Sequence, residues 1–461
     1  DRHGGGGTRA AAPEAGVPAP VDRPADGARR LGRRGGLPQH LRHRRRAGPG
    51  SVAGHRRTLI AAGVLTPAEV LDRYEAKRAE VQRLATEASE RPQLDSAKAV
   101  MAPLAPRRPA QVEARIDKLT WTEPQTFAQS VNRTLAQLLD QYPSLCVFGE
   151  DVARKGGVYG VTRGLQKRAG AGRVFDTLLD EQSILGLGLG LGVSGLLPIP
   201  EIQYLAYLHN AADQLRGEGA SLPFFSNGQY RNPMVVRIAG YGYQKGFGGH
   251  FHNDNAIAAL RDIPGLVIAS PSRPDDAAAM LRTCVAAADV DGTLSVFLEP
   301  IALYHTRDLH DDGDGGWLAP APSEHVPIGR GRTYGDGTDL TLVTFGNGVR
   351  MSLRVARRLA AEGVAARVLD LRWLAPLPLD DLLREAAATG RVLVVDETRR
   401  TGGVSEGVIA ALSDGGFTGI VQRVASEDSF IPLGEAARTV LLSEESIHDA
   451  AISLAAQQLH I

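Results

Sequence analysis

One glycine-rich segment has the residue types and spacing of a nucleotide-binding loop. Gly190-Leu-Gly-Val-Ser-Gly195 fits the pattern G-x-G-x-x-G, whose glycines let the backbone approach the pyrophosphate of a dinucleotide. Such a motif follows a strand, opens a helix and is followed by an acidic residue about 20 positions later. Here no strand-like run directly precedes the glycines, which alternate with leucines from Gly186 to Gly192. We therefore predict that they allow close helix packing.

Other motifs that carry chemistry are weak or missing. Gly335-Asp-Gly337 begins like the magnesium motif of thiamine-diphosphate enzymes. That motif needs an Asn later in the chain, and the only nearby one, Asn347, is too close, so we predict a turn without a ligand. The sequence contains no GxxxxGK[ST], HExxH or GxSxG. The two cysteines, Cys146 and Cys284, stand far apart in apolar stretches, which excludes a disulfide scaffold and a structural zinc site and fits a cytoplasmic setting.

The composition is that of a globular protein, with 43% hydrophobic and 23% charged residues. The length of 461 residues predicts about three folded units. Because the formal net charge is +0, we expect neither nucleic acid nor a membrane as a partner. The charge is uneven, because residues 1–57 contain 13 Arg and 4 acidic residues. This segment has almost no large apolar side chains, so we expect it to be disordered. Two interpretations stay open for it, a basic nucleic-acid arm and a non-native reading frame.

The uncharged stretch Gln182–Pro200 approaches the length of a membrane span, which needs about 20 residues. It contains five glycines and two prolines, and polar sequence resumes directly after it. We predict a buried, glycine-rich helix and a turn.

The remaining sequence predicts the elements that position any site. Residues 58–118 contain a helix that starts at Thr66-Pro67 and a Pro-rich linker, 101–109. Residues 119–325 alternate helices (Pro124–Tyr142 and Pro274–Ala288) with short apolar runs, which indicates a parallel sheet covered on both faces. The expected strands are Leu145–Phe148, Val174–Phe175, Met234–Ile238, Leu266–Ala269 and Leu294–Leu298.

The same alternation begins again after residues 311–322. The expected strands are Leu340–Thr344, Ala366–Asp370 and Val392–Val395, and the expected helices cover Val349–Ala361, Asp380–Ala388, a segment from Val404, and Ser446–Leu459. The predicted fold class is α/β, with two doubly wound sheet domains at 119–325 and 326–461 after the disordered segment 1–57 and the helix and linker 58–118.

An ordered series of phrases carries a resemblance that covers residues 120–455. They are Phe148-Gly-Glu-Asp-Val152, Gly157-Val-Tyr-Gly-Val-Thr-Arg-Gly164, Arg173-Val-Phe-Asp-Thr177 with Glu181, Pro200-Glu-Ile-Gln-Tyr204 with Ala212-Asp-Gln214, Gly248-Gly-His-Phe-His252, Pro264-Gly-Leu266, Ser270-Pro271, Asp370-Leu-Arg-Trp-Leu-Ala-Pro376 and Val395-Asp-Glu397. Together they resemble the β subunit of thiamine-diphosphate-dependent 2-oxo-acid dehydrogenases, in the transketolase-like group.

This resemblance implies a pyrimidine-binding domain and a transketolase-type C-terminal domain. In that family the cofactor lies between two halves: the β half holds the aminopyrimidine, and an α half holds magnesium and diphosphate. Residues 58–118 look like the end of an α-type half, so this chain is expected to need an α-type partner or to be part of a fused α–β chain. The implied assembly is a heterotetramer or a dimer of fused chains.

The resemblance also assigns the candidate site residues. Glu181 matches the glutamate that bonds the pyrimidine ring nitrogen and favours the tautomer that deprotonates the thiazolium carbon; otherwise it is a helix-start carboxylate. Tyr207 matches the aromatic residue that stacks on the pyrimidine, or it is a core aromatic. His252 matches the histidine of a His-Ser-Gln loop, although Asn253 and Asp254 replace Ser and Gln here. His250 is a second candidate, and Glu150 is expected in an acidic relay between paired sites.

The function implied by the resemblance is decarboxylation of a 2-oxo acid, such as pyruvate or a branched-chain acid. The acyl group then passes to a lipoyl group on a dihydrolipoyl acyltransferase within a multienzyme complex. Two alternatives stay open: a catalytically silent association subunit, and a ketol transferase of the transketolase type. The chain alone is expected to bind thiamine diphosphate poorly.

Overall fold

The computed structural model describes residues 52–118 and 121–458, of which 52–93 form one compact unit and 94–458 another. Most of the segment predicted to be disordered, 1–57, lies outside the described residues. Residues 52–57 differ from that prediction, because they belong to helix α1 (Val52–Ala61).

The first unit consists of α1 and the long helix α2 (Pro67–Ser89). The predicted start of α2 is confirmed. The Thr66 hydroxyl accepts a hydrogen bond from the Glu69 amide (3.2 Å), and the Glu69 carboxylate accepts one from the Thr66 amide (2.7 Å). This capping box satisfies backbone donors that have no partner within the helix.

A seven-stranded sheet lies at the centre of the larger part of the second unit, in the order β10-β5-β6-β4-β3-β1-β2. Its strands are parallel except β10, which runs antiparallel to β5. The strands are β1 (Leu145–Gly149), β2 (Val174–Asp176), β3 (Leu197–Ile202), β4 (Met234–Gly240), β5 (Val267–Ala269), β6 (Leu294–Pro300) and β10 (Trp373–Ala375).

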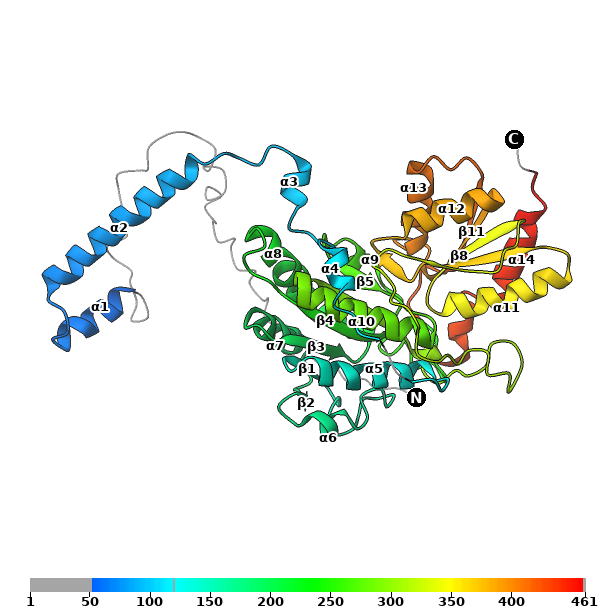
Figure 1. Ribbon diagram of the computed structural model, residues 1–461, viewed down its shortest axis with the longest axis horizontal. Helices are drawn as coiled ribbons and strands as arrows, with labels where there is room; N and C mark the ends of the chain where they lie inside the picture. The colour runs from blue at the N-terminus through cyan, green and yellow to red at the C-terminus, as the bar shows by residue number, and fades with distance from the viewer. Residues whose placement is uncertain (1–51, 119–120, 459–461) are drawn as a thin grey trace, which may run out of the picture. The chain divides into compact units, whose positions relative to one another are not determined.

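Helices cover both faces of this sheet, as predicted (Figure 1). On one face lie α5 (Phe127–Gln141) and α10 (Pro274–Asp291); on the other lie α7 (Glu181–Val193) and the short helices η1 (Leu205–Ala211) and η2 (Gln214–Ala220). Successive side chains of a strand point to opposite faces, so Val235 joins the first layer and Val236 the second. Short helices complete the unit: α3 (Ala97–Met101), α4 (Pro109–Glu113), α6 (Leu165–Ala169), α8 (Ser221–Phe225), α9 (Ala258–Arg261) and η3 (Ile301–Leu303).

A second, five-stranded sheet has the order β12-β11-β8-β9-β7, with only β7 antiparallel. Helices α11 and α14 pack on one face, and α12 and α13 on the other. The elements are β7 (Arg332–Tyr334), β8 (Leu340–Thr344), α11 (Asn347–Ala361), β9 (Ala366–Asp370), α12 (Leu379–Thr389), β11 (Arg391–Arg399), α13 (Val404–Asp414), β12 (Ile420–Ser426), η4 (Gly434–Thr439) and α14 (Glu444–Ala455).

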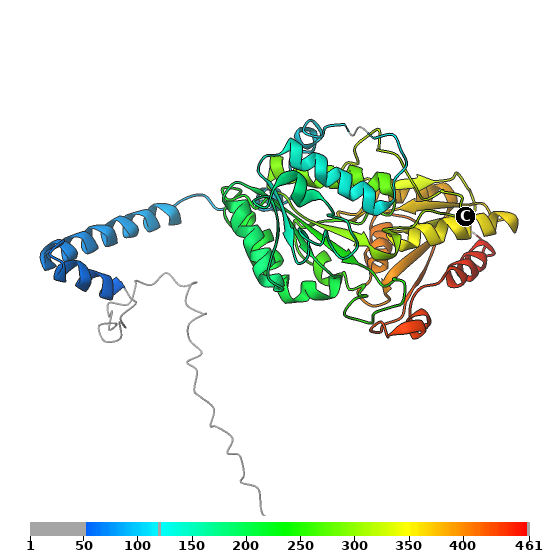
Figure 2. The same ribbon diagram turned by 90° about the horizontal axis from the view of Figure 1, so that it is seen from below.

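The two sheets share one hydrophobic core. Phe148 and Val236 from the first sheet belong to the same buried cluster as Leu369 and Val394 from the second. The rings of Tyr241 and Phe345 also meet, with 6.1 Å between their centroids. Figure 2 shows the C-terminal elements, yellow to red, side by side with the green elements of the first sheet. The two sheets therefore form one packed body.

The stretch Gln182–Pro200 corrects one prediction. Helix α7 is present and a turn at residues 194 and 195 follows it, as predicted, but only one face of α7 is buried, and the stretch ends in a strand that was not predicted, β3, which starts at Leu197. Pro198 and Pro200 argued against a strand here, because proline has no backbone N–H to donate to a β-ladder. They are accommodated because β3 pairs with β4 only from Glu201 onward.

Some glycines of α7 allow close packing, as predicted, and others do not contribute to it. A Cβ added at Gly188 would lie 2.6 Å from the Met234 sulfur, and one at Gly192 would lie 2.9 Å from the Pro233 carbonyl oxygen. A Cβ at Gly190 would meet nothing within 4 Å. The predicted turn at Gly335 is confirmed, with a φ of +73° between β7 and β8.

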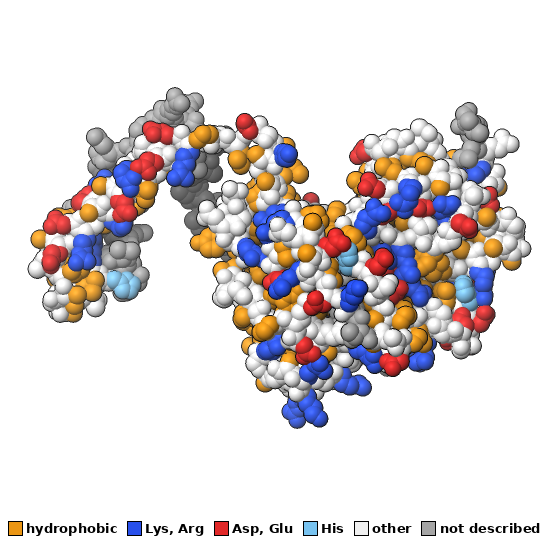
Figure 3. Space-filling view, viewed as in Figure 1, with side chains coloured by type: hydrophobic (Ala, Val, Ile, Leu, Met, Phe, Trp, Pro, Cys, Tyr) orange, Lys and Arg blue, Asp and Glu red, His pale blue; other side chains and the backbone are white. Residues whose placement is uncertain are grey.

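The visible surface mixes both signs of charge. Lys and Arg side chains alternate with Asp and Glu over the second unit in the view of Figure 3. Among the described residues, no helix combines the length and the apolar character needed to cross a membrane.

Candidate functional site

Three adjacent parallel strands end at one cavity. Glu150 directly follows β1, Gln203 directly follows β3, and Glu181 starts the helix after β2. The carboxyl ends of neighbouring parallel strands lie at the same edge of a sheet, which is where α/β proteins bind ligands. An open cavity of about 730 Å³ lies there, lined by Glu150, Leu179, Asp180, Glu181, Gln182, Gln203, Tyr207 and Asn210.

Glu181 is held at the first position of α7 and is partly buried. The Asn210 side-chain amide donates a hydrogen bond to Glu181 Oε2 at 3.3 Å. The positive end of the helix dipole also favours a carboxylate at this position. The place of Glu181 in the helix is thus compatible with the alternative interpretation, a simple helix-start carboxylate. Its place at the cavity, however, makes the Glu181 carboxylate available to a ligand.

Glu150 lines the same cavity as Glu181. Partial burial raises the pKa of Glu150, and the negative charges of Asp151 and Glu181 raise it further. Because like charges disfavour the ionised form, a proton is held more easily here than on an isolated glutamate.

Tyr207 lines the cavity from η1 and is partly exposed. Its ring packs edge-on against Tyr204, with 5.6 Å between the ring centroids. Burial raises the pKa of Tyr207, as do Tyr204, Glu150 and Glu181 nearby. A partly exposed aromatic ring is thus fixed beside two carboxylates.

The structure separates the two candidate histidines. The exposed His252 packs edge-on against Tyr204 (4.9 Å between ring centroids) and Tyr207 (6.5 Å), so it lies at the rim of the site. The His250 ring instead lies 4.6 Å from that of Phe430, and it is not among the residues that line the cavity. Of the five candidates, His250 alone has no contact with the other four within the part of the chain that the structure describes.

The two residues that depart from the His-Ser-Gln pattern anchor the loop. The Asn253 side-chain amide donates to the Gly242 carbonyl oxygen (3.3 Å), and the buried Asp254 accepts from Arg399 of the second sheet (3.1 Å). Burial raises the pKa of Asp254, but His209 and Arg399 outweigh it and hold that pKa below its ordinary value. Asp254 therefore ties the histidine loop to His209 of η1 and to β11, and Asn253 ties it to the segment after β4.

Three residues of the site were missed by the sequence analysis: Asn210, His209 and Tyr204 as a ring contact. Asn210 stands three positions after Tyr207 on the same short helix, so the two side chains can serve one site. A signal for Asn210 was therefore present, but only once η1 was assigned as a helix.

The charge of the cavity limits what it can hold. Three carboxylates, Glu150, Asp180 and Glu181, line it without any Lys or Arg, so a diphosphate would be repelled. A neutral, flat heterocycle fits better, because a carboxylate can bond its ring nitrogen and Tyr207 offers an aromatic face. Among the described residues no group of three or more His, Cys, Asp or Glu side chains is arranged to hold a metal ion.

Comparisons with known proteins agree with this architecture. The family described as "Transketolase, pyrimidine binding domain" matches residues 123–305, and "Transketolase, C-terminal domain" matches residues 329–447. The chain is 32% identical over 334 residues to the pyruvate dehydrogenase E1 component subunit beta of Bacillus subtilis, and 34% identical to that of Staphylococcus epidermidis; each match covers 71% of this chain and 97% of the relative. A solved structure described as "Split gene transketolase, inactive beta4 tetramer" has the same fold, with a TM-score of 0.58, 20% identity, and coverage of 72% of this chain and 98% of that one.

Proposed function

This chain belongs to the family of the pyruvate dehydrogenase E1 β subunits, and on that premise we propose that it is the β-type component of a thiamine-diphosphate-dependent 2-oxo-acid dehydrogenase. The observation that carries the proposal is the joint position of Glu181 and Tyr207 in one cavity at the carboxyl edge of the first sheet. A carboxylate and an aromatic ring are what an aminopyrimidine needs on its edge and on its face.

Four residues of the cavity have an assigned task. When bound, thiamine diphosphate supplies the carbon nucleophile and the electron sink for decarboxylation of a 2-oxo acid. Glu181 holds a proton at the pyrimidine ring nitrogen, and Asn210 orients the carboxylate through its hydrogen bond. Tyr207 packs against the heterocycle and excludes water from one side. Glu150 lies next to Glu181, and its raised pKa means that it takes up a proton more readily than an isolated glutamate.

His252 completes the site at its rim. It is exposed and fixed by Tyr204 and by its Nδ1, which lies 3.3 Å from the Gly248 carbonyl oxygen. A neutral imidazole has one ring nitrogen that donates a proton and one that accepts one. We assign it to the transfer of the acyl group to a lipoyl group of a dihydrolipoyl acyltransferase.

The diphosphate and Mg²⁺ belong on an α-type half. The cavity of this chain has carboxylates where a diphosphate would need donors. Titration calorimetry of the chain alone with thiamine diphosphate and Mg²⁺ is therefore expected to show negligible heat. Tight, Mg²⁺-dependent binding by the isolated chain would contradict this division of labour.

Replacement of Glu181 tests the central assignment. In an assembly with an α-type partner, Glu181→Gln removes the carboxylate but keeps its size, and decarboxylation should fall about 10²- to 10⁴-fold, the range of acid–base catalysis. The rate is measured with an artificial electron acceptor, so that transfer to lipoyl is not required. The exposed Glu218 of η2 lies outside the cavity, and Glu218→Gln is the matched control.

The same measurement separates the alternatives. A silent association subunit predicts equal activity for wild type and Glu181→Gln. A ketol transferase predicts activity with sugar phosphates and none with pyruvate or branched-chain 2-oxo acids. Loss of activity on 2-oxo acids in Glu181→Gln alone supports the dehydrogenase component.

A further inference from the structure

A second cavity opens at the start of α5, away from the carboxylate-lined site. It has a volume of about 820 Å³, within the range of 300–1,000 Å³ that small-molecule sites occupy. No residue lines both cavities. The lining combines polar side chains of α5, the loop 158–163 and the segment after η3, and it contains no Asp or Glu.

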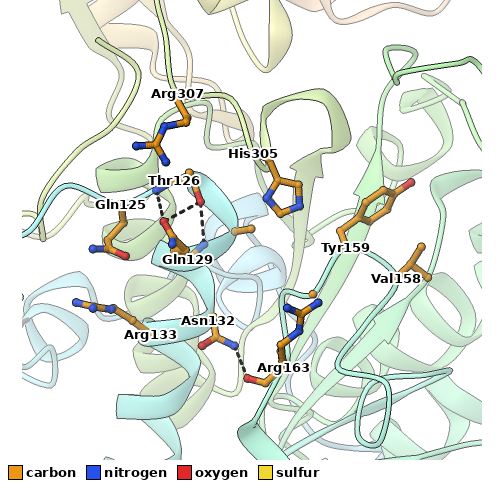
Figure 4. Close-up of a pocket in the computed structure, with 12 residues that line it drawn as sticks. Gln125, Thr126, Gln129, Asn132, Arg133, Val158, Tyr159, Arg163, His305 and Arg307 are labelled. Atoms are coloured by element: carbon orange, nitrogen blue, oxygen red, sulfur yellow. Dashed lines mark hydrogen bonds between the residues drawn. The ribbon is translucent and has the colours of Figure 1, made fainter. Parts of the chain in front are cut away.

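Cationic side chains from three separate elements meet at this cavity: Arg133 of α5, Arg163 of the loop and Arg307 after η3, with His305 beside them. Figure 4 shows the guanidinium groups of Arg163 and Arg307 approaching from opposite sides, with the His305 ring between their levels. Such convergence of positive charge is unfavourable unless an anion is present.

Two of these arginines have no partner in the part of the chain that the structure describes. Neither Arg163 nor Arg307 has a side-chain hydrogen bond or ion pair there, whereas Arg133 lies 3.4 Å from the exposed Glu123. Arginine presents five donors in a planar fork that matches phosphate and carboxylate groups. The donors of Arg163 and Arg307 are therefore free for a ligand.

The helix that borders the cavity adds to its positive character. The first turn of α5 contains no acidic residue, and its capping box uses the neutral Gln129, which accepts from the Thr126 amide at 3.0 Å. The partial positive charge at the start of α5 is thus not compensated by an acid of that turn. Asn132 and the Tyr159 ring complete a lining that has both polar and flat surfaces.

Tyrosines separate this cavity from the carboxylate-lined site. The Tyr159 hydroxyl donates to that of Tyr204 at 3.3 Å and accepts from the Gln244 amide at 2.9 Å. Tyr204 in turn contacts His252 and Tyr207. A ligand here would therefore lie one tyrosine pair away from the proposed reaction, without entering it.

We propose that this cavity binds a small anion that carries two or more phosphate or carboxylate groups. Arg163 and Arg307 bind the oxyanions, and the α5 N-terminus favours the negative charge. The site does not depend on the proposed function, because every residue that forms it belongs to this chain.

The test is calorimetry on the full chain at low ionic strength, with inorganic diphosphate and citrate as separate probes. At least one probe is expected to bind, and the stronger one identifies the preferred oxyanion. Arg163→Gln and Arg307→Gln are each expected to weaken that probe about tenfold, and the double variant about a hundredfold, since each replacement removes a charge-assisted hydrogen bond. The exposed Arg216 of η2 lies outside the cavity, so Arg216→Gln should bind like the wild type.

Thermal unfolding checks that each variant is folded, which is expected because both arginines are exposed. The proposal is overturned if neither probe binds the wild type. It is equally overturned if Arg216→Gln weakens binding as much as the two cavity variants, because the effect would then follow the net charge and not the site.

Discussion

The charge of Glu181 contributes to the raised pKa of Glu150, which lines the same cavity. Among the causes that raise the pKa of Glu150, burial comes first, followed by the charges of Asp151 and Glu181. Removal of the Glu181 charge should therefore lower the pKa of Glu150 toward its ordinary value. The shift can be followed by NMR titration of labelled glutamate side chains, with the Glu150 signal assigned through Glu150→Gln.

Asp180→Asn is the matched control for this titration. Asp180 lines the same cavity but is not among the causes of the Glu150 shift. It should leave the Glu150 pKa unchanged. An equal shift in both variants would mean that the two glutamates are not specifically coupled.

Most residues of the candidate site, but not all, could be predicted from the sequence. The resemblance supplied Glu181, Tyr207 and Glu150, which the structure brings to one cavity, and His252, which lies at its rim. His250 could not be distinguished from His252 by sequence, because the separation depends on Phe430, which is distant in the chain. Asn210 was out of reach for a similar reason, since its role comes from a hydrogen bond across η1 and α7. The catalytic roles themselves stay predictions.

The glycines of α7 allow an element-scale test of packing. Gly192→Ala would bring a Cβ within 2.9 Å of the Pro233 backbone oxygen, so it should lower the free energy of unfolding by about 1–3 kcal/mol through overpacking. Gly190→Ala meets no neighbour within 4 Å and should raise it by about 0.5–1 kcal/mol, the gain in helix propensity.

Urea unfolding of the two variants beside the wild type measures both changes. Because the substitution is identical and the sites are two residues apart on one helix, propensity alone predicts equal effects. A stabilised Gly192→Ala would show that α7 can move away from the β3–β4 layer.

Elements were predictable where local pattern and packing agree. β8 and β9 have the predicted bounds, and α5, α10 and α11 differ by a few residues at their ends. The strands that were missed lack such a pattern: β3 carries two prolines, β7 and β10 have three residues each, and the residues of β12 are mostly half-buried. Their pairing is decided by neighbouring strands and not by their own composition.

Buried acids where the two sheets meet give the whole molecule a pH dependence. Burial raises the pKa of Glu397, on β11, to about 8, even though the Asn347 backbone and side-chain amides donate to it at 2.7 Å each. Burial and the charge of Asp276 likewise raise the pKa of Asp370, on β9, to about 7. Both acids bind protons more tightly in the folded than in the unfolded chain.

The sign of the effect follows from proton linkage. Between about pH 5 and pH 8 the folded chain holds a proton on Glu397 that the unfolded chain has released, so stability falls as the pH rises, by up to about 1.4 kcal/mol per pH unit for one such group. Urea unfolding at several pH values should show a free energy of unfolding that decreases from acidic to alkaline conditions.

Glu397→Gln should make this dependence less steep, while the contribution of Asp370 stays. A glutamine stays neutral, and the Asn347 side-chain oxygen, which has no hydrogen-bond partner, can accept from the new amide after a flip of Asn347. The exposed Glu218→Gln should keep the wild-type slope. An unchanged slope in Glu397→Gln would assign the dependence to other groups.

The antiparallel strand β10 limits where this protein can be truncated. Its residues, Trp373–Ala375, follow the start of the second sheet in the chain, yet they close the outer edge of the first sheet against β5. Truncation upstream of Trp373 would leave the amides and carbonyls of β5 unpaired at an exposed sheet edge. Such an edge can pair with another chain, so the truncated protein should self-associate. The recombinant halves should therefore precipitate when expressed apart and become recoverable when co-expressed.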